Sequence, residues 1–282
     1  MLTPHLIADA VQRALAEDAP WGDLTAQLAI PDSAQLSVAL VGREPGVFAG
    51  GDLVREACRQ VDPAIEVTEL ASDGYAFGVG EVLARIAGSA RGILTAERVA
   101  LNFAQRLSGI ATLTAAYVAE VAGTRARIAD TRKTTPGLRA LEKHAVRAGG
   151  GANHRFSLSD AVMIKDNHLA ALGATEGPAL TAALRELRAR VGHTTAIVVE
   201  VDRLDQLGPV LDAGITSVLF DNFSLDDLAE GVRIVDGRAV CEASGGVSLD
   251  TVGAIARTGV DVISVGRLTH GATALDLGLD AA

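Results

Sequence analysis

The second half of the chain, from about residue 126, repeats one pattern of hydrophobic and polar positions. Six short apolar runs, ARIAD, AVMI, AIVV, SVLF, AVC and DVIS, each lead into polar or glycine residues and then a helical stretch. The last four recur every 21 or 22 residues, which is the spacing of a compact strand–loop–helix unit. Nearly continuous apolar strands with helical connections predict a parallel sheet that is covered on both faces.

Polar groups follow all six predicted strands. A (β/α) barrel places such groups around its active site, whereas an open doubly wound sheet collects them near a switch point. Because all six strands end in the same way, the pattern favours a barrel. The chain has too few residues for eight full units, so we expect the barrel to be open and incomplete, with the first domain covering the gap.

The first third of the chain mixes amphipathic helices with short strands of alternating polarity. We expect helices at residues 4–17 and 51–61, and strands at 36–40, 65–70 and 82–87. Because the strands are short and alternating, this region is predicted to be an α+β unit with antiparallel strands.

Residues 94–121 predict two helices joined near Ser108–Gly109, the first capped by Thr95. Arg98 lies on the first of these helices. On helix statistics alone it is a solvated surface arginine.

Composition narrows the class of protein. A hydrophobic content of 49% and a mean hydropathy of +0.28 favour a well-buried globular core. The sequence has no 18-residue apolar run and no secretory pattern at its start, and Cys58 and Cys241 lack metal or redox spacing. A net charge of −10 argues against binding to DNA or to an anionic membrane. We therefore expect a soluble cytoplasmic protein.

Residues 130–168 form a basic island in this acidic chain. The stretch holds seven Lys or Arg against four acidic residues. Nucleic-acid binders usually spread their charge over a face and interleave aromatic residues, but this stretch contains only Phe156. Concentrated charge beside Gly149–Gly151 fits a small polyanion better, such as a phosphate or a carboxylate.

Four basic residues of the island follow predicted strands or lie in the loop between them: Arg132, Lys133, Arg155 and Lys165. Arginine binds a carboxylate or phosphate through two parallel hydrogen bonds, and lysine acts as a movable point charge. In a barrel these side chains converge. The set therefore predicts anion binding, although each residue alone also fits a salt-bridge network.

Other residues of the island have two interpretations. Arg139, Lys143 and Arg147 are spaced four apart, and we expect them on the solvated face of one helix. Gly149–Gly151 is either a flexible helix stop or a backbone that approaches a ligand closely. His154 is either a buried hydrogen-bonded imidazole or a donor to a ligand oxygen.

Carboxylates and glycines follow the later strands. Glu200 and Asp221 either orient the basic cluster or hold sugar hydroxyls or a hard cation, since Mg²⁺ sites use one or two carboxylates plus substrate phosphates. Ser244–Gly246 and Ser264–Gly266 form turns of the kind that hold a phosphate through backbone N–H groups. His168 is expected to be structural. The sequence has no zinc spacing and no Walker, GxGxxG or GxSxG block.

Several blocks of the chain closely resemble the quinolinate phosphoribosyltransferase family. The most specific are TRKTTPG, GGGANHR and IKDNH, and the blocks EDAPWGDLT, RGILTAERVALNFAQRLSGIAT, VVEVD, LFDN and EASGG stand in family order. The resemblance implies an N-terminal α+β sandwich domain, which we place at residues 1–112, and an open α/β barrel with the active site, which we place at 113–269. The apolar tail, 270–282, is expected to pack back onto the first domain.

The resemblance also implies roles for single residues. The implied substrate-binding set is Arg98, Thr131, Arg132, Lys133, His154, Arg155, Lys165, Glu200, Asp221, Ser244, Gly245, Gly246, Ser264, Val265 and Gly266. Within it, Arg98 corresponds to an arginine supplied across a dimer interface, which replaces its interpretation as a surface residue. Ser157 stands where the family more often has glycine.

The catalytic set implied by the resemblance is Lys133, Lys165, Glu200 and Asp221, with Mg²⁺ shared between the two carboxylates and phosphoribosyl pyrophosphate. The implied reaction joins quinolinate to phosphoribosyl pyrophosphate and yields nicotinate mononucleotide, pyrophosphate and CO₂, in a homodimer or a dimer-based hexamer. Two alternatives stay open, a homologue linked to molybdenum utilisation and a non-catalytic phosphosugar-binding barrel. The intact basic set counts against both.

Overall fold

The computed structural model describes residues 2–281 and divides into two compact units. Unit 1 comprises the chain up to Ala115, Thr134–Gly150 and the chain from Leu268 onward. Unit 2 comprises Ala116–Lys133 and Gly151–Arg267. The units divide after Ala115 and before Leu268, within a few residues of the boundaries that we placed, but residues 134–150 fold with unit 1 and not with the barrel. The predicted active site has two basic loops, the first at residues 131–133 and the second at 151–159. Along the chain, these two loops flank a segment that belongs to the other unit.

Unit 1 contains a four-stranded antiparallel sheet in the order β12-β1-β5-β3. Its strands are β1 (Gln35–Gly42), β3 (Glu66–Thr68), β5 (Val82–Ser89) and β12 (Leu277–Ala281), and a small ribbon joins β2 (Gly46–Val47) to β4 (Ala76–Phe77). The tail supplies β12, which pairs with β1 along five residues. Leu40 of β1 and Leu277 of β12 are both buried, so the tail completes an apolar layer.

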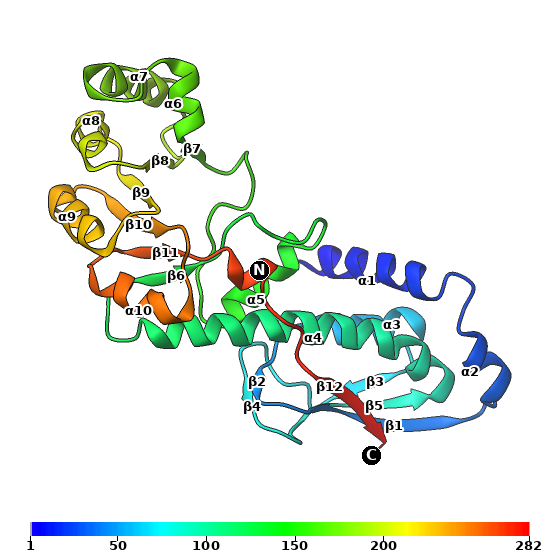
Figure 1. Ribbon diagram of the computed structural model, residues 1–282. Helices are drawn as coiled ribbons and strands as arrows, with labels where there is room; N and C mark the ends of the chain where they lie inside the picture. The colour runs from blue at the N-terminus through cyan, green and yellow to red at the C-terminus, as the bar shows by residue number, and fades with distance from the viewer. Residues whose placement is uncertain (1, 282) are drawn as a thin grey trace. The chain divides into compact units, whose positions relative to one another are not determined.

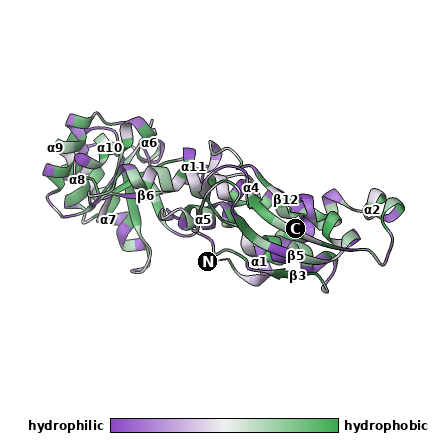
Figure 2. Ribbon diagram, turned by 90° about the horizontal axis from the view of Figure 1, so that it is seen from below, coloured by the Kyte–Doolittle hydropathy of each residue, from purple (hydrophilic) through white to green (hydrophobic). Residues whose placement is uncertain are grey.

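Helices α3 (Gly51–Val61) and the first part of α4 (Ala90–Glu120) cover one face of this sheet (Figure 1). The other helices of unit 1 are α1 (Pro4–Asp18), α2 (Leu24–Ala29) and α5 (Arg139–Ala148), with α11 (Arg267–His270) leading to the tail. Figure 2 colours much of α4 and the neighbouring strands as hydrophobic. The predicted helices 4–17 and 51–61 are confirmed.

Residues 90–120 form one continuous helix, so the prediction of two helices joined near Ser108–Gly109 is wrong. Ser108 is fully buried, and its Oγ accepts the N–H of Ala49 at 3.0 Å. A Cβ on Gly109 would lie 1.9 Å from the carbonyl oxygen of Thr273. Small residues therefore stand here because other backbone segments touch the helix, not because the helix ends.

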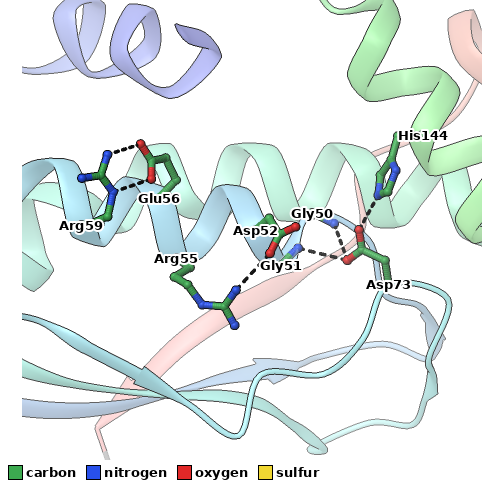
Figure 3. Close-up of polar contacts among 8 residues, drawn as sticks. All are labelled: Gly50, Gly51, Asp52, Arg55, Glu56, Arg59, Asp73 and His144. Atoms are coloured by element: carbon green, nitrogen blue, oxygen red, sulfur yellow. Dashed lines mark hydrogen bonds and ion pairs between the residues drawn. The ribbon is translucent and has the colours of Figure 1, made fainter. Parts of the chain in front are cut away.

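Figure 3 shows how α5 is tied to α3 within unit 1. One oxygen of Asp73 accepts the N–H groups of Gly50 (3.0 Å) and Gly51 (3.1 Å), where α3 begins. Its other oxygen lies 2.6 Å from Nε2 of His144 on α5. Helix N-termini leave N–H groups without intrahelical partners, so a carboxylate from a distant loop both caps α3 and fixes α5.

Unit 2 contains a six-stranded parallel sheet in the order β6-β11-β10-β9-β8-β7. Its strands are β6 (Arg127–Ala129), β7 (Val162–Ile164), β8 (Ile197–Val201), β9 (Ser217–Asp221), β10 (Val240–Ser244) and β11 (Val262–Ser264). These are the six predicted apolar runs. Among the described residues, β6 and β7 are the two ends of the sheet, so the barrel is open as predicted.

Helices line the outside of this sheet (Figure 1): α6 (Asp166–Leu172), α7 (Gly177–Arg190), α8 (Leu207–Asp212) after the short 3-10 turn Leu204–Gln206, α9 (Leu225–Val235) and α10 (Leu249–Arg257). Phe220 of β9 faces them, since a Cβ on Gly231 of α9 would lie 2.7 Å from its ring. Because side chains alternate along a strand, Leu219 and Asp221 face the barrel interior.

Candidate active site

The strand register places several predicted site residues on the interior face of the barrel. Glu200 of β8 is level with Leu219 of β9, which is level with Glu242 of β10. Two steps further along β9, Asp221 is level with Ser244. Residues at the same level of parallel strands share a face. Carboxylates from three neighbouring strands therefore line the interior near the carboxyl ends, where barrel active sites lie.

Lys165 follows β7 and contacts Glu200. Its Nζ and Oε2 of Glu200 form an ion pair in which the carboxylate is mostly buried. The N–H of Lys165 donates to Nδ1 of His168 at 3.0 Å, which closes the first turn of α6. His168 thus has the structural role predicted for it.

Two arginines of the basic island lie close enough to affect each other. Partial burial lowers the pKa of Arg155, and the nearby positive charge of Arg132 lowers it further, against a raising effect of Asp160. Arg155 Nη1 donates to the carbonyl oxygen of Ala161 at 2.8 Å. Like charges repel, so two guanidinium groups that influence each other at strand ends favour the binding of an anion.

Asp130, at the end of β6, organises the loop that carries His154 and Arg155. It is fully buried and accepts the backbone N–H of His154 at 2.9 Å and Nδ2 of Asn153 at 2.5 Å. In the ring of His154, Nδ1 accepts the N–H of Arg155 at 2.7 Å, and Nε2 lies 3.4 Å from Oε2 of Glu242. Both ring nitrogens therefore face protein atoms.

Sequence reasoning missed Asp130 and Glu242 as individual residues. Each is a single acid inside an apolar run, ARIAD and AVCEAS, and that pattern was the available signal. A carboxylate is seldom buried in a strand unless other groups are built around it.

The loop after β9 meets the loop after β10. Asn222 has a left-handed backbone conformation (φ 57°) and donates from Nδ2 to Asp221 at 3.0 Å. A Cβ on Gly245 would lie 2.1 Å from Oδ1 of Asn222, so this position requires glycine. Gly246 also has positive φ, but open space surrounds it. An exposed backbone in this conformation suits contact with a phosphate.

The turn after β11 is bound to the sheet by a backbone hydrogen bond, unlike the exposed loop after β10. Ser264 is buried, and the N–H of Val265 donates to the carbonyl oxygen of Ala129 at 2.8 Å. The N–H of Val265 therefore takes part in the strand ladder. Within Ser264–Gly266, any contact with a phosphate has to come from other groups than this N–H.

Thr131 shapes the first basic loop. Its Oγ1 accepts the N–H of Lys133 at 3.0 Å, which forms a tight turn directly after β6. Lys133 is exposed, and Arg132 is half-buried. In the second basic loop, Ser157 accepts the N–H of Ser159 at 3.2 Å, so a side chain closes the turn at the position where glycine was expected.

Glu142 of α5 holds the other end of the first basic loop, within unit 1. It is fully buried and accepts the N–H of Thr135 at 3.0 Å and its hydroxyl at 2.8 Å. Arg106 of α4 donates to the same carboxylate at 2.7 Å. Thr135 lies two residues beyond Lys133, so this network anchors the chain where it leaves the basic loop.

The predicted solvated face of α5 is wrong for Lys143, which is 3% exposed. Arg147 is exposed, and Nε of Arg139 donates to Oγ1 of Thr134 at 3.0 Å. Lys143 is covered because α5 packs on more than one side. A Cβ on Gly149 would lie 2.3 Å from the carbonyl oxygen of Ala111, so close packing against α4 accounts for this glycine.

Glu200 and Asp221 have the donor chemistry that Mg²⁺ requires, since both supply carboxylate oxygens on one face of adjacent strands. No group of three or more His, Cys, Asp or Glu side chains within residues 2–281 is arranged to hold a metal by itself. A site that combines one or two carboxylates with substrate phosphates fits these residues. Glu200 is already paired with Lys165, so a cation would share this carboxylate with the ammonium group.

Arg98 lies on α4 in unit 1, and its side chain is exposed. The predicted site residues of unit 2 all lie at the carboxyl ends of its strands or in the loops that follow them. No helix within residues 2–281 is both long and apolar enough to cross a membrane.

Comparisons with known proteins match both parts of the chain to one family. Residues 23–108 match the quinolinate phosphoribosyl transferase N-terminal domain, and residues 110–280 match the C-terminal domain of the same family. The nicotinate-nucleotide pyrophosphorylase [carboxylating] of Mycobacterium leprae is 45% identical over 96% of this chain and 96% of its own length. The probable enzyme of the same name from Bacillus subtilis is 41% identical over 94% of this chain and 89% of its own length.

Solved structures show the same fold. The structure of NadC from Streptococcus pyogenes has a TM-score of 0.94 and 38% identity, and it covers 100% of this chain and 98% of its own. The nicotinate-nucleotide pyrophosphorylase from Francisella tularensis has a TM-score of 0.92 and 39% identity, with the same coverage. On the sequence blocks, the two matched domains and the shared fold, this chain belongs to the quinolinate phosphoribosyltransferase family.

Proposed function

We propose that this chain converts quinolinate and phosphoribosyl pyrophosphate into nicotinate mononucleotide, pyrophosphate and CO₂, a step of NAD biosynthesis. One observation carries the proposal most directly. Arg132 and Arg155, whose positive charges are close enough to influence each other, belong to loops at the carboxyl ends of barrel strands, in the same unit as the Lys165–Glu200 pair. A dicarboxylate and a phosphorylated sugar are the substrates that such a set of charges accommodates.

Quinolinate carries two carboxylates on neighbouring ring atoms. Arg132 and Arg155 supply forked donors that match carboxylates, and Lys165 supplies a point charge beside them. Thr131 and His154 complete this part of the site by fixing the turns from which the basic side chains emerge. Relatives whose names include quinolinate phosphoribosyltransferase [decarboxylating] support this substrate.

Phosphoribosyl pyrophosphate binds to the remaining residues of the site. Lys133 is exposed and serves the pyrophosphate, while Glu200 and Asp221 accept the ribose hydroxyls. The loops Ser244–Gly246 and Ser264–Gly266 receive the 5′-phosphate, with the open backbone at Gly246 as the clearest contact point. Glu200 and Asp221, together with the substrate, would hold Mg²⁺, which would supply positive charge to neutralise the pyrophosphate.

The chemistry needs orientation and electrostatic stabilisation. The bond between C1′ and the pyrophosphate oxygen breaks, and its electron pair leaves with pyrophosphate, whose charge Lys133 stabilises. The lone pair of the pyridine nitrogen forms the new bond to C1′, a step that requires the two atoms to be held in line. The ring nitrogen is then positively charged, so it stabilises the electron pair left on C2 when the adjacent carboxylate departs as CO₂. A proton then replaces the carboxylate at C2.

We also propose that two copies of the chain assemble, as a homodimer or a dimer-based hexamer, and that Arg98 serves the site of the partner copy. Its exposure on α4 leaves it available for such a contact.

A cytoplasmic location fits the two cysteines, Cys58 and Cys241, which are both free and buried, with pKa values that burial raises to about 11.

The proposal is tested by release of ¹⁴CO₂ from carboxyl-labelled quinolinate with phosphoribosyl pyrophosphate and Mg²⁺. We expect release to require all three components. Arg132→Ala should lower kcat/KM by roughly a hundredfold or more, because a charge-assisted contact to the substrate is lost. Arg147→Ala is the matched control, since this arginine belongs to the same basic island but is exposed on α5.

Two results would contradict the proposal. The first is a folded chain that binds phosphoribosyl pyrophosphate but releases no CO₂, which would favour a phosphosugar-binding barrel or the homologue linked to molybdenum utilisation. The second is equal activity in Arg132→Ala and Arg147→Ala, which would show that the arginine pair is not part of the site.

A further inference from the structure

Glu242 is a buried carboxylate that the proposed reaction does not use. It lies on the interior face of β10 and is 5% exposed. Within residues 2–281, its Oε1 is the buried side-chain oxygen that lacks any hydrogen-bond partner. Its Oε2 lies 3.4 Å from Nε2 of His154. An unpartnered buried oxygen costs stability, so its presence in a strand requires a reason other than folding.

The hydrogen bonds around His154 define which ring nitrogen holds the proton. The backbone N–H of Arg155 can only donate, and it donates to Nδ1 at 2.7 Å. Nδ1 must therefore present its lone pair, and the proton of the neutral imidazole is on Nε2. That N–H faces Glu242, which is an acceptor when ionised. The carboxylate and the backbone amide thus select the same tautomer from opposite sides of the ring.

The neighbouring carboxylate, Asp130, shows what a structural acid looks like in this unit. Its two oxygens accept from the backbone of His154 and from Asn153, and it is fully buried. Asp130 fixes where the backbone of the loop lies. Glu242 instead meets that loop at the imidazole of His154. Its effect is therefore on the orientation of the ring.

We propose that Glu242 is a positioning residue for the substrate-binding arginine. It holds the Nε2–H tautomer of His154, and Nδ1 of His154 in turn holds the N–H of Arg155, whose guanidinium receives a carboxylate of the substrate. The part of this inference that concerns substrate rests on the proposed function, but the link from Glu242 through His154 to Arg155 does not.

The first test reads the tautomer directly in the protein without substrate. The chain is labelled with ¹⁵N-histidine, and His154→Asn identifies the His154 signals among the six histidines in long-range ¹H–¹⁵N spectra. We expect the proton on Nε2 in the unchanged chain. Glu242→Leu removes the acceptor and should give mixed tautomers, whereas Glu242→Gln keeps a carbonyl acceptor and should retain the single form. Glu142→Gln makes the same chemical change in unit 1 and should leave the His154 signals unchanged.

The second test separates positioning from stability by steady-state kinetics. In Glu242→Leu the KM for quinolinate should rise about tenfold, the effect of one displaced hydrogen bond, while kcat changes less than about twofold. The KM for phosphoribosyl pyrophosphate should change little, and Glu242→Gln should restore most of the quinolinate KM. Circular dichroism confirms that each variant is folded.

A proton on Nδ1 in the unchanged chain would overturn the inference without any variant. So would a Glu242→Leu variant that loses stability but keeps both the tautomer and the quinolinate KM, since Glu242 would then have only a structural role. If the unchanged chain releases no CO₂, the proposed function fails, but the tautomer spectra still decide the link from Glu242 to His154.

Discussion

Two buried glutamates, Glu142 in unit 1 and Glu242 in unit 2, support the two basic loops in different ways. Both side chains are almost inaccessible to solvent. Glu142 receives donors on both oxygens, from Arg106 and from the backbone and hydroxyl of Thr135. Glu242 faces the imidazole of His154 and has one oxygen without a partner among the described residues.

The difference separates two ways of building a site. A carboxylate with all its hydrogen bonds formed fixes a backbone, because breaking any bond leaves another buried group unpaired. An incompletely paired carboxylate contributes little to folding and influences only the group that it faces. A buried carboxylate whose hydrogen bonds are all formed therefore indicates a role in folding, and one with an unpaired oxygen indicates a role in the site.

The largest effect is expected for Glu142→Ala. It leaves the guanidinium of Arg106 without its carboxylate, and loss of one partner of a buried pair typically costs about 3–5 kcal/mol. Urea unfolding followed by circular dichroism measures the loss. Glu186→Ala is the control, because Glu186 forms an exposed pair with Arg190 and should leave the unfolding midpoint unchanged. An equal midpoint in Glu142→Ala and Glu186→Ala would refute the role of Glu142.

A smaller, pH-dependent effect is expected for Asp73→Asn. Burial raises the pKa of Asp73, but hydrogen bonds from His144, Gly51 and Gly50 outweigh it, and the pKa falls below the ordinary value of 3.8. The group therefore adds stability above about pH 4, and this stability is lost as the pH falls through the folded pKa.

At pH 7, Asp73→Asn should lower the free energy of unfolding by about 2 kcal/mol, the usual contribution of hydrogen bonds to a charged group. The difference from the unchanged chain should narrow as the pH falls below about 4. Urea unfolding at several pH values measures both quantities. A difference that stays constant from pH 7 to pH 3 would mean that ionisation of Asp73 is not involved. The exposed pair Asp52–Arg55 in Figure 3 serves as a reference for a weak surface contact.

The smallest change in stability is expected for Glu242→Leu. Replacement of a buried, incompletely paired ionic group by an apolar side chain is often neutral, so the free energy of unfolding should change by less than about 1 kcal/mol. The same urea titration measures it. A loss as large as that of Glu142→Ala would abolish the distinction between the two glutamates.

Much of the fold was predictable because hydrophobic periodicity reports burial directly. All six apolar runs of the second half form strands of one parallel sheet. The error at Ser108–Gly109 has a physical cause. Small residues mark either a break in a helix or a place where another backbone touches it, and only the packing of Thr273 decides between the two.

The candidate site was predictable where motifs bring charge together, as at Arg132 and Arg155. The supporting residues were not, because Glu142, Glu242 and Asp130 act through contacts with residues distant in sequence or on other elements. Lys143 shows the same limit, since a spacing of four predicts one helix face but does not tell which side is covered.

The pairing of β12 with β1 has a consequence for synthesis on the ribosome. Leu40 is level with Leu279, so the central sheet of unit 1 needs residues from both extremes of the sequence. Vectorial translation delivers β1 before unit 2 and its neighbour β12 after unit 2, and until β12 is made, β1 presents an open edge to other nascent chains. Contacts so distant along the polymer also slow folding. Unit 1, although encoded first, is thus completed only after all of unit 2 has been made.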